Sequence, residues 1–247
     1  GFMTAIFLSI SIPLSVIAIM MNRTMGTTLS GIPNKPSCFD ENTLLQLNNG
    51  QFKKIKDIEV GDILTNNNIV TSKMKMSSKY ETLYSIDGTF VTGDHKVYVN
   101  NKTVCVKFHP HAKIVLNKEH KLYSLNTSNK FIQINNTIFC DYDEMTDDET
   151  NRLYVNIEHH KNIIKHEDNT FIHTYYDGGF TANTEIKLVN HSFKRIDKIE
   201  INDILENGSR IIGIVEILNH SLHNKMNRFV VHNNEFYAHA HLNVKYL

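Results

Sequence analysis

The fold expected for this chain depends on the stretch Cys38-Phe-Asp-Glu-Asn-Thr-Leu-Leu-Gln-Leu47 and on Gly31-Ile-Pro-Asn-Lys-Pro-Ser37 before it. Two prolines and a glycine disfavour helix and central strand, so residues 31–37 are predicted to form a loop. The loop delivers one cysteine to the start of an apolar run. An ionised thiol there can attack the carbonyl carbon of the preceding residue and form a thioester. The alternative is that Cys38 is a small buried apolar residue, as lone cysteines often are.

Short apolar runs separated by turns follow this stretch. Residues 44–47 and 55–58 are separated by a segment containing Asn49-Gly50, and Asn-Gly between two such runs is a strong hairpin signal. The spacing, with no long amphipathic helix, predicts a mostly β fold. Further strands are predicted at residues 60–64, 83–86, 90–91, 96–99, 104–106, 122–125, 131–134 and 138–139.

An internal repeat is visible in the second half of the chain. Residues 179–205 align without gaps on residues 38–64, and 13 of the 27 positions are identical. Such a repeat indicates that the same supersecondary unit occurs twice. Gly179 stands at the position of Cys38, so the second copy is expected to keep the strand framework without the nucleophile. The identical pairs include Phe39/Phe180, Thr43/Thr184, Ile58/Ile199 and Asp62/Asp203.

A second chemical motif, Thr92-Gly-Asp-His95, follows the strand predicted at residues 90–91. A threonine and a histidine three residues apart on a turn can face one point, where they can hydrogen-bond a peptide nitrogen and donate a proton to it. Histidine suits general acid catalysis near neutral pH. A histidine in a turn is usually exposed to solvent and has no catalytic role. The Thr-x-x-His pattern becomes specific because Cys38 lies upstream of it.

Composition excludes several classes of function. The 26 lysines and arginines balance the 26 aspartates and glutamates, which speaks against a nucleic-acid partner. Three cysteines, an odd number, indicate free thiols rather than a disulfide framework. The 14 histidines lack paired cysteines at zinc-like spacing, so neither a metal site nor a cofactor is expected.

The N-terminal segment is apolar. Residues 2–21 carry no charge over about twenty residues, which is long enough for a helix to cross a bilayer. We therefore expect a hydrophobic, transmembrane helix at residues 1–24 and a linker at 25–37. Arg23 and Lys35 favour a cytoplasmic C-terminal portion. A buried apolar helix is one alternative. A signal peptide is another, but the basic n-region is missing and the start at Gly1 indicates a piece of a longer polypeptide.

Three blocks of this sequence resemble, in the same order, those of Hint domains, the fold shared by inteins and hedgehog autoprocessing domains. They are the block from Cys38 to Leu64, the block from Val91 to His95, and the closing run that ends near Glu144. The closing run is most similar to Hint proteins of large DNA viruses. The resemblance implies a horseshoe-like β fold with a pseudo-twofold repeat. It predicts a Hint domain at residues 38–145, a linker or short helix at 146–178, and a degenerate second copy at 179–247 that packs on the first.

The resemblance also implies roles for individual residues. Cys38 would be the nucleophile that moves the Ser37 acyl group from nitrogen to sulfur. His95 would protonate the departing nitrogen, and Thr92 would hold or distort the scissile bond.

Four accessory candidates, and a departure from the intein pattern, follow from the same comparison. The candidates are Asp94, His109, Cys140 and Asp141. His109 is equally read as a solvated loop residue, and Cys140 is either a strand-end packing residue or a second thiol. Inteins end in His-Asn followed by a nucleophile, whereas Tyr142 follows Asp141 here. An aspartate carboxylate lacks the amide nucleophile, so splicing is not expected.

The sequence therefore predicts a single-turnover, cysteine-dependent autoprotease that cuts the Ser37–Cys38 bond. Its substrate is its own upstream segment, and water or a small nucleophile resolves the thioester. The alternative is a catalytically degenerate Hint fold that serves as a structural or interaction domain of a membrane or virion protein. Residues 2–21 predict association with a membrane, with the Hint portion in the cytoplasm, and the viral resemblance extends this expectation to a virion or viral membrane.

Overall fold

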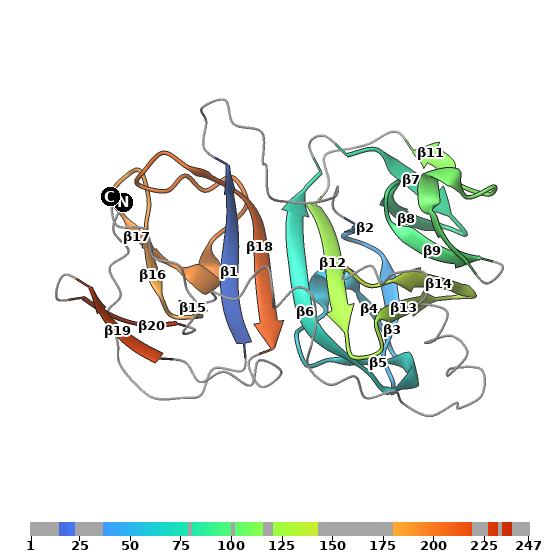
Figure 1. Cartoon of the computed structure of the whole chain (residues 1–247), viewed down its shortest axis with the longest axis horizontal. Helices are drawn as coiled ribbons and strands as arrows, with labels where there is room; N and C mark the ends of the chain where they lie inside the picture. The colour runs from blue at the N-terminus through green and yellow to red at the C-terminus, as the bar shows by residue number, and fades with distance from the viewer. Residues whose placement is uncertain are drawn as a thin grey trace. The chain divides into compact units, whose positions relative to one another are not determined.

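The computed structural model describes residues 15–22, 37–78, 81–99, 102–115, 121–142, 180–218, 227–231 and 234–238. The chain divides into two compact units. Pro33–Asn169 is called the Cys38 unit, and Gly1–Ile32 with Thr170–Leu247 is called the repeat unit. The described elements are strands and one-turn 3₁₀ helices, which confirms the mostly β fold (Figure 1).

The main sheet of the Cys38 unit is antiparallel, with the strand order β11-β7-β8-β2-β12-β6, and β5 also pairs with β6. A second sheet has the order β10-β9-β14-β13, and β3 and β4 form a hairpin. The strands of the main sheet are β2 (Phe39–Asp40), β5 (Ile63–Leu64), β6 (Asn68–Ser77), β7 (Leu83–Ile86), β8 (Thr89–Thr92), β11 (Lys113–Val115) and β12 (Lys121–Thr127). The others are β3 (Leu44–Gln46), β4 (Phe52–Lys54), β9 (Lys96–Val99), β10 (Lys102–Cys105), β13 (Phe131–Ile134) and β14 (Thr137–Cys140).

Most predicted strands are confirmed, with corrections where the chain turns. The hairpin turn ends at Gly50, whose φ of +84° favours glycine. The strand predicted at residues 55–58 is wrong, because Ile55–Asp57 form the 3₁₀ helix η1. Two further 3₁₀ helices are η2 (Thr65–Asn67) and η3 (Val106–Phe108). The ten-residue strand β6 was not predicted, because its many polar residues hide the apolar pattern that marks a strand.

The apolar core of the Cys38 unit lies directly behind the predicted catalytic blocks. Phe39, Val91, Val97 and Phe139 are fully buried in it and come from both sheets. Phe39 and Phe139 meet edge to face with ring centroids 5.1 Å apart. The residues on either side of these phenylalanines are thereby held in place by close packing.

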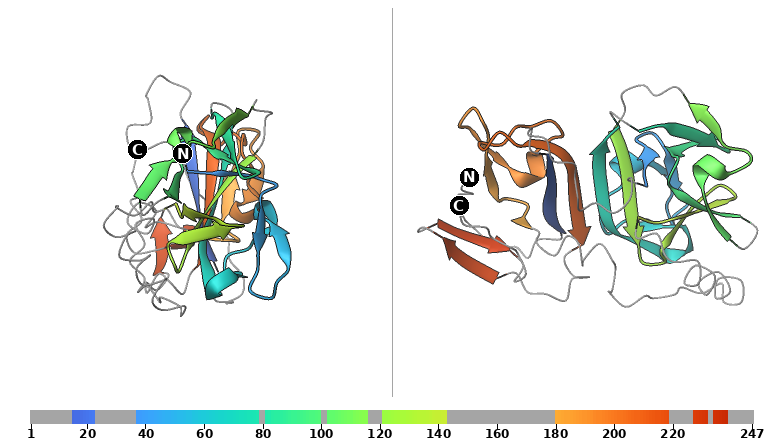
Figure 2. Two further views of the ribbon diagram at one scale, coloured as in Figure 1. Left: turned by 90° about the vertical axis from the view of Figure 1, so that its right-hand side faces the viewer. Right: turned by 45° about the horizontal axis from the view of Figure 1, so that its top comes forward.

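The repeat unit contains a five-stranded antiparallel sheet with the order β18-β1-β15-β20-β19 (Figures 1 and 2). These strands are β1 (Ser15–Asn22), β15 (Phe180–Thr181), β18 (Arg210–Leu218), β19 (Asn227–Val231) and β20 (Asn234–Ala238). A separate hairpin of β16 (Glu185–Lys187) and β17 (Phe193–Arg195) leads into the 3₁₀ helix η4 (Ile196–Lys198).

The expected N-terminal helix is wrong for residues 15–22, which form strand β1 between β15 and β18. The segment is rich in β-branched residues, which fit a pleated sheet, and two flanking strands supply partners for its backbone. Residues 1–14 and the linker or helix predicted at 146–178 lie outside the described residues. Within the described ranges, no helix is long and apolar enough to span a membrane.

The two units share one strand arrangement. The order β6-β12-β2-β8-β7 in the Cys38 unit corresponds to β18-β1-β15-β20-β19 in the repeat unit. By the sequence repeat, β2 corresponds to β15 and β6 to β18. Strand β1 therefore occupies the place of β12, although β12 lies downstream of β2 and β6 in the chain and β1 lies upstream of β15 and β18.

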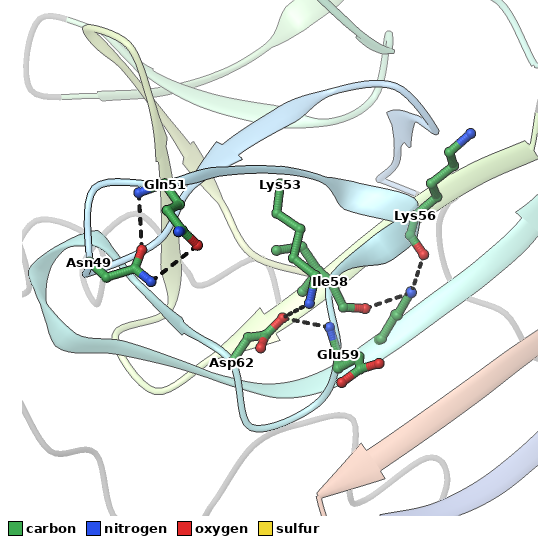
Figure 3. Close-up of polar contacts among 8 residues, drawn as sticks. Asn49, Gln51, Lys53, Lys56, Ile58, Glu59 and Asp62 are labelled. Carbon is green, nitrogen blue, oxygen red and sulfur yellow. Dashed lines mark hydrogen bonds and ion pairs between the residues drawn. The ribbon is translucent and has the colours of Figure 1, made fainter.

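A carboxylate clamp is also repeated. Asp62 Oδ2 accepts hydrogen bonds from the backbone N–H of Glu59 (2.8 Å) and from Lys53 Nζ (2.8 Å), as Figure 3 shows. In the repeat unit, Asp203 makes the same two bonds with the backbone N–H of Glu200 (2.8 Å) and with Lys194 Nζ (2.9 Å). The identity of these aspartates in the sequence repeat thus has a structural cause.

Candidate active site

Thr92 holds the backbone of Cys38 from two sides. The Cys38 N–H donates to Thr92 Oγ1 at 3.0 Å, and the Thr92 N–H donates to the Cys38 carbonyl oxygen at 2.8 Å. The antiparallel pairing of Phe39 with Val91 places the two residues opposite each other. Ser37, Cys38 and Thr92 are all buried, so this contact is shielded from water.

His95 lies three residues beyond Thr92 on the same turn, which is closed by the hydrogen bond from the His95 N–H to the Thr92 carbonyl oxygen. Its ring is fully buried against Phe39 (centroids 4.5 Å apart) and Phe139 (5.6 Å). Nε2 lies 2.9 Å from the carbonyl oxygen of Cys140, and Nδ1 has no hydrogen-bond partner among the described residues. With a carbonyl as partner, Nε2 carries the proton and Nδ1 presents a lone pair.

Burial lowers the pKa of His95 from 6.5 to about 4, and the hydrogen bond to the Cys140 carbonyl opposes this shift only in part. The ring is therefore neutral at neutral pH. A neutral ring with a free lone pair accepts a proton before it can donate one, whereas the sequence comparison implied a general acid.

Gly93 allows the turn to pass under the ring of Tyr84. A Cβ atom at residue 93 would lie 2.6 Å from Tyr84 Cε2 and 3.2 Å from Lys107 Cβ. No sequence motif marks Tyr84, because its place beside Gly93 depends on β7 pairing with β8. Phe139, which packs on His95, was missed as a site residue for the same kind of reason.

Two of the accessory candidates make their described contacts outside this cluster. Asp94 forms an ion pair with Lys107 at the outer side of the turn. His109 Nδ1 accepts the backbone N–H of His111 at 3.2 Å, and the two imidazole rings contact each other. Neither arrangement includes Cys38 or Thr92.

Cys140 and Asp141 lie at the end of β14. Cys140 is buried, pairs with Phe131 and reaches the site through its carbonyl oxygen on His95. Asp141 is also buried, and its Oδ2 accepts the Thr127 N–H at 3.0 Å, where the pairing of β12 shifts register. The closing block thus contributes a backbone acceptor, which a side-chain motif cannot reveal.

In the repeat unit the site residues are replaced. Gly179 aligns with Cys38, and β20 pairs Ala238 with Phe180 as β8 pairs Val91 with Phe39. If Ala238 is aligned with Val91, His239 aligns with Thr92 and Leu242 with His95. His239 and Leu242 lie outside the described residues. In the described part of the chain there is no group of three or more histidine, cysteine or acidic residues that could hold a metal ion.

Comparisons with known proteins give a partial likeness, which is to solved structures. No family model and no curated protein matches the sequence. Among solved structures, the chain is similar to the gp41-1 intein in a crystal structure of a triple variant, with a TM-score of 0.32 and 18% sequence identity. The match covers 42% of this chain and 99% of the intein chain.

Proposed function

We propose that the Cys38 unit is a Hint-type autoprotease that cuts its own Ser37–Cys38 peptide bond. The observation that supports this most directly is the grip of Thr92 on the nitrogen of that bond, inside a buried site that also contains His95. A threonine with a purely structural role would not need a buried cysteine beside it. The proposed acyl shift uses the Cys38 thiol, the Thr92 hydroxyl and the His95 imidazole.

The proposed reaction has two steps. Cys38 Sγ attacks the Ser37 carbonyl carbon, a C–S bond forms, the C–N bond to Cys38 breaks, and the released nitrogen takes up the thiol proton to become an amine. Water or another small nucleophile then attacks the thioester. Hydrolysis leaves a carboxylate on Ser37 and restores the Cys38 thiol.

His95 serves this reaction as a base first and an acid second. Neutral Nδ1 accepts the thiol proton, and the resulting imidazolium, held by the Cys140 carbonyl at Nε2, passes it to the departing nitrogen. The low pKa makes the imidazolium a strong acid, which favours the second transfer.

The repeat unit has a structural role in this proposal. It keeps the five-strand order and the Asp203 clamp but has Gly179 in place of the nucleophile. The association with a membrane, a virion or the cytoplasmic side that the sequence predicted remains a prediction.

The test is the intact mass of a full chain carrying a tag ahead of Gly1, incubated with hydroxylamine or dithiothreitol. We expect cleavage that yields a fragment ending at Ser37, seen as a separate mass in denaturant, and no cleavage of Cys38→Ala. Cys105→Ala is the matched control, because Cys105 is a cysteine outside the site, on β10. Equal release from Cys38→Ala and the unaltered chain would refute the mechanism. Cys140→Ala separates the two roles considered for that thiol: unchanged release leaves it as a packing residue.

A further inference from the structure

Strand β1 pairs with β15 in the same register in which β12 pairs with β2. In the Cys38 unit, Leu122 and Tyr123 of β12 pair with Asp40 and Phe39 of β2. In the repeat unit, Val16 and Ile17 pair with Thr181 and Phe180, the counterparts of those two residues.

The other edge of β1 repeats the register of β12 as well. Lys121 of β12 pairs with Ser77, and Ser15 of β1 pairs with Leu218, the counterpart of Ser77. Even the irregularity is reproduced, because the register shifts between Asn126 and Thr127 in one strand and between Met20 and Met21 in the other. Strand β1 therefore fills a defined slot between β15 and β18, which the Cys38 unit fills with a downstream strand.

A strand in that position is held on both edges. All eight residues from Ser15 to Asn22 have partners in β18, and two of them also have partners in β15. Removing β1 would expose the backbone N–H and C=O groups of both neighbours, and unpaired edges of this kind are unfavourable. The apolar sequence of residues 16–21 is typical of a strand covered on both faces.

We propose that the segment upstream of Cys38 stays bound after the Ser37–Cys38 bond is cut, as a donor strand in the slot between β15 and β18. The proposal rests on the proposed function for the cut itself. The partner that this slot fits is an extended apolar segment, and the chain carries one on the far side of its own scissile bond. Cleavage then yields two chains that β-pairing holds together in native buffer and that separate only in denaturant.

The experiment creates the cut independently of Cys38. In the full chain carrying Cys38→Ala, the recognition sequence of a specific protease replaces residues 26–32, and the nicked protein is analysed by size exclusion and mass spectrometry. We expect the fragment containing β1 to elute with the remainder in native buffer and to separate from it in denaturant. Elution of the fragment alone, or its transfer into detergent micelles while the remainder stays folded, would overturn the proposal.

Ile17 offers a matched pair of variants, since it has a partner in both neighbouring strands. Ile17→Pro removes its N–H and should lower the retained fraction about tenfold or more, whereas Ile17→Val should retain the fragment. Equal retention by both variants would also refute the strand pairing. In the unaltered chain, failure to cut at Ser37–Cys38 would refute the proposed function, while the protease-nicked protein would still report on the slot.

Discussion

At the scale of single residues, Thr92 and His95 have different roles in the proposed reaction. The Thr92 hydroxyl accepts the Cys38 N–H and its backbone N–H donates to the Cys38 carbonyl oxygen, so in that reaction Thr92 positions the nitrogen of the Ser37–Cys38 bond. His95 is held by two phenylalanine rings and one carbonyl oxygen, which leave Nδ1 for proton transfer. Neither residue supplies both functions.

Replacing the Thr92 hydroxyl should separate positioning from packing. Thr92→Val keeps the shape but removes the acceptor of the Cys38 N–H. We expect it to slow fragment release roughly ten- to hundredfold, the equivalent of one lost buried hydrogen bond. Thr92→Ser keeps the hydroxyl and should stay near the rate of the unaltered chain. The rate of hydroxylamine-induced release measures both variants, and equal rates for Val and Ser would contradict the role of the hydroxyl.

The buried His95 should make stability depend on pH. Its pKa is about 4 in the fold and 6.5 when exposed, so between these values the unfolded chain binds more protons. The contribution of neutral His95 to the free energy of unfolding is therefore fully present above pH 6.5. It is lost as pH falls towards 4, which lowers the free energy of unfolding by roughly 3 kcal/mol in total.

The measurement compares thermal unfolding of the unaltered chain and His95→Gln at pH 7, 5.5 and 4.5. Other groups titrate in both proteins, so the difference between the two isolates His95. We expect the advantage of the unaltered chain to shrink as pH falls. A difference that stays constant over this range would show that His95 is not buried as a neutral ring.

At the scale of elements, one turn occurs three times. In each copy, one residue donates its N–H to the carbonyl oxygen of the residue three positions earlier. The carbonyl oxygen of that same residue accepts the N–H of the first residue of a 3₁₀ helix. Thr43, His95 and Thr184 hold this position before η1, η3 and η4. Two of the copies lie within the Cys38 unit and one lies in the repeat unit. The candidate site lies at the copy of this turn that carries a histidine.

Gly93 tests whether that turn sets the geometry of the site. Gly93→Ala would bring Cβ to within 2.6 Å of Tyr84, so the ring or the turn must move. We expect fragment release to slow roughly ten- to hundredfold, because small displacements at a reacting centre are costly.

The double variant Gly93→Ala with Tyr84→Leu removes the ring that the new methyl group meets. It should recover most of the lost rate, with Tyr84→Leu alone as the reference. A double variant as slow as Gly93→Ala would place the effect in the backbone of residue 93 and not in the contact with Tyr84.

At the scale of the whole molecule, the proposed reaction cuts the chain once, and the residues at the end of the Cys38 unit support that proposal. The Asp141 carboxylate is engaged by the Thr127 N–H, and Tyr142 donates its N–H to the Leu125 carbonyl oxygen. Splicing by the intein route needs a side-chain amide at this position, and aspartate has none.

We therefore expect the species that begins at Cys38 to keep Leu247 as its last residue. Intact mass and a C-terminal tag check this directly. A ligated product joining Ser37 to a residue downstream of Asp141 would contradict it. Asp141→Asn is the informative control, because it supplies the amide: if cleavage after residue 141 then appears, the carboxylate alone prevents it in the unaltered chain.

Features that depend only on neighbouring residues could be predicted from the sequence. Turn residues such as Gly50 and the contiguous blocks around Cys38 and Thr92 predicted the hairpin, the β class and the two groups that the structure brings together. Such signals are local, because a turn or a motif needs only a few adjacent residues.

The groups that contact His95 and the strand formed by residues 15–22 follow from contacts between distant parts of the chain. The acceptor on His95 is a backbone carbonyl, and every residue has one, so no sequence pattern could mark Cys140 for that role. An uncharged run such as residues 15–22 suits a membrane helix, a buried helix or a central strand equally well. Its state depends on whether a strand far away in the chain offers backbone partners, and β18, at Arg210–Leu218, offers them in the register that β6 offers to β12.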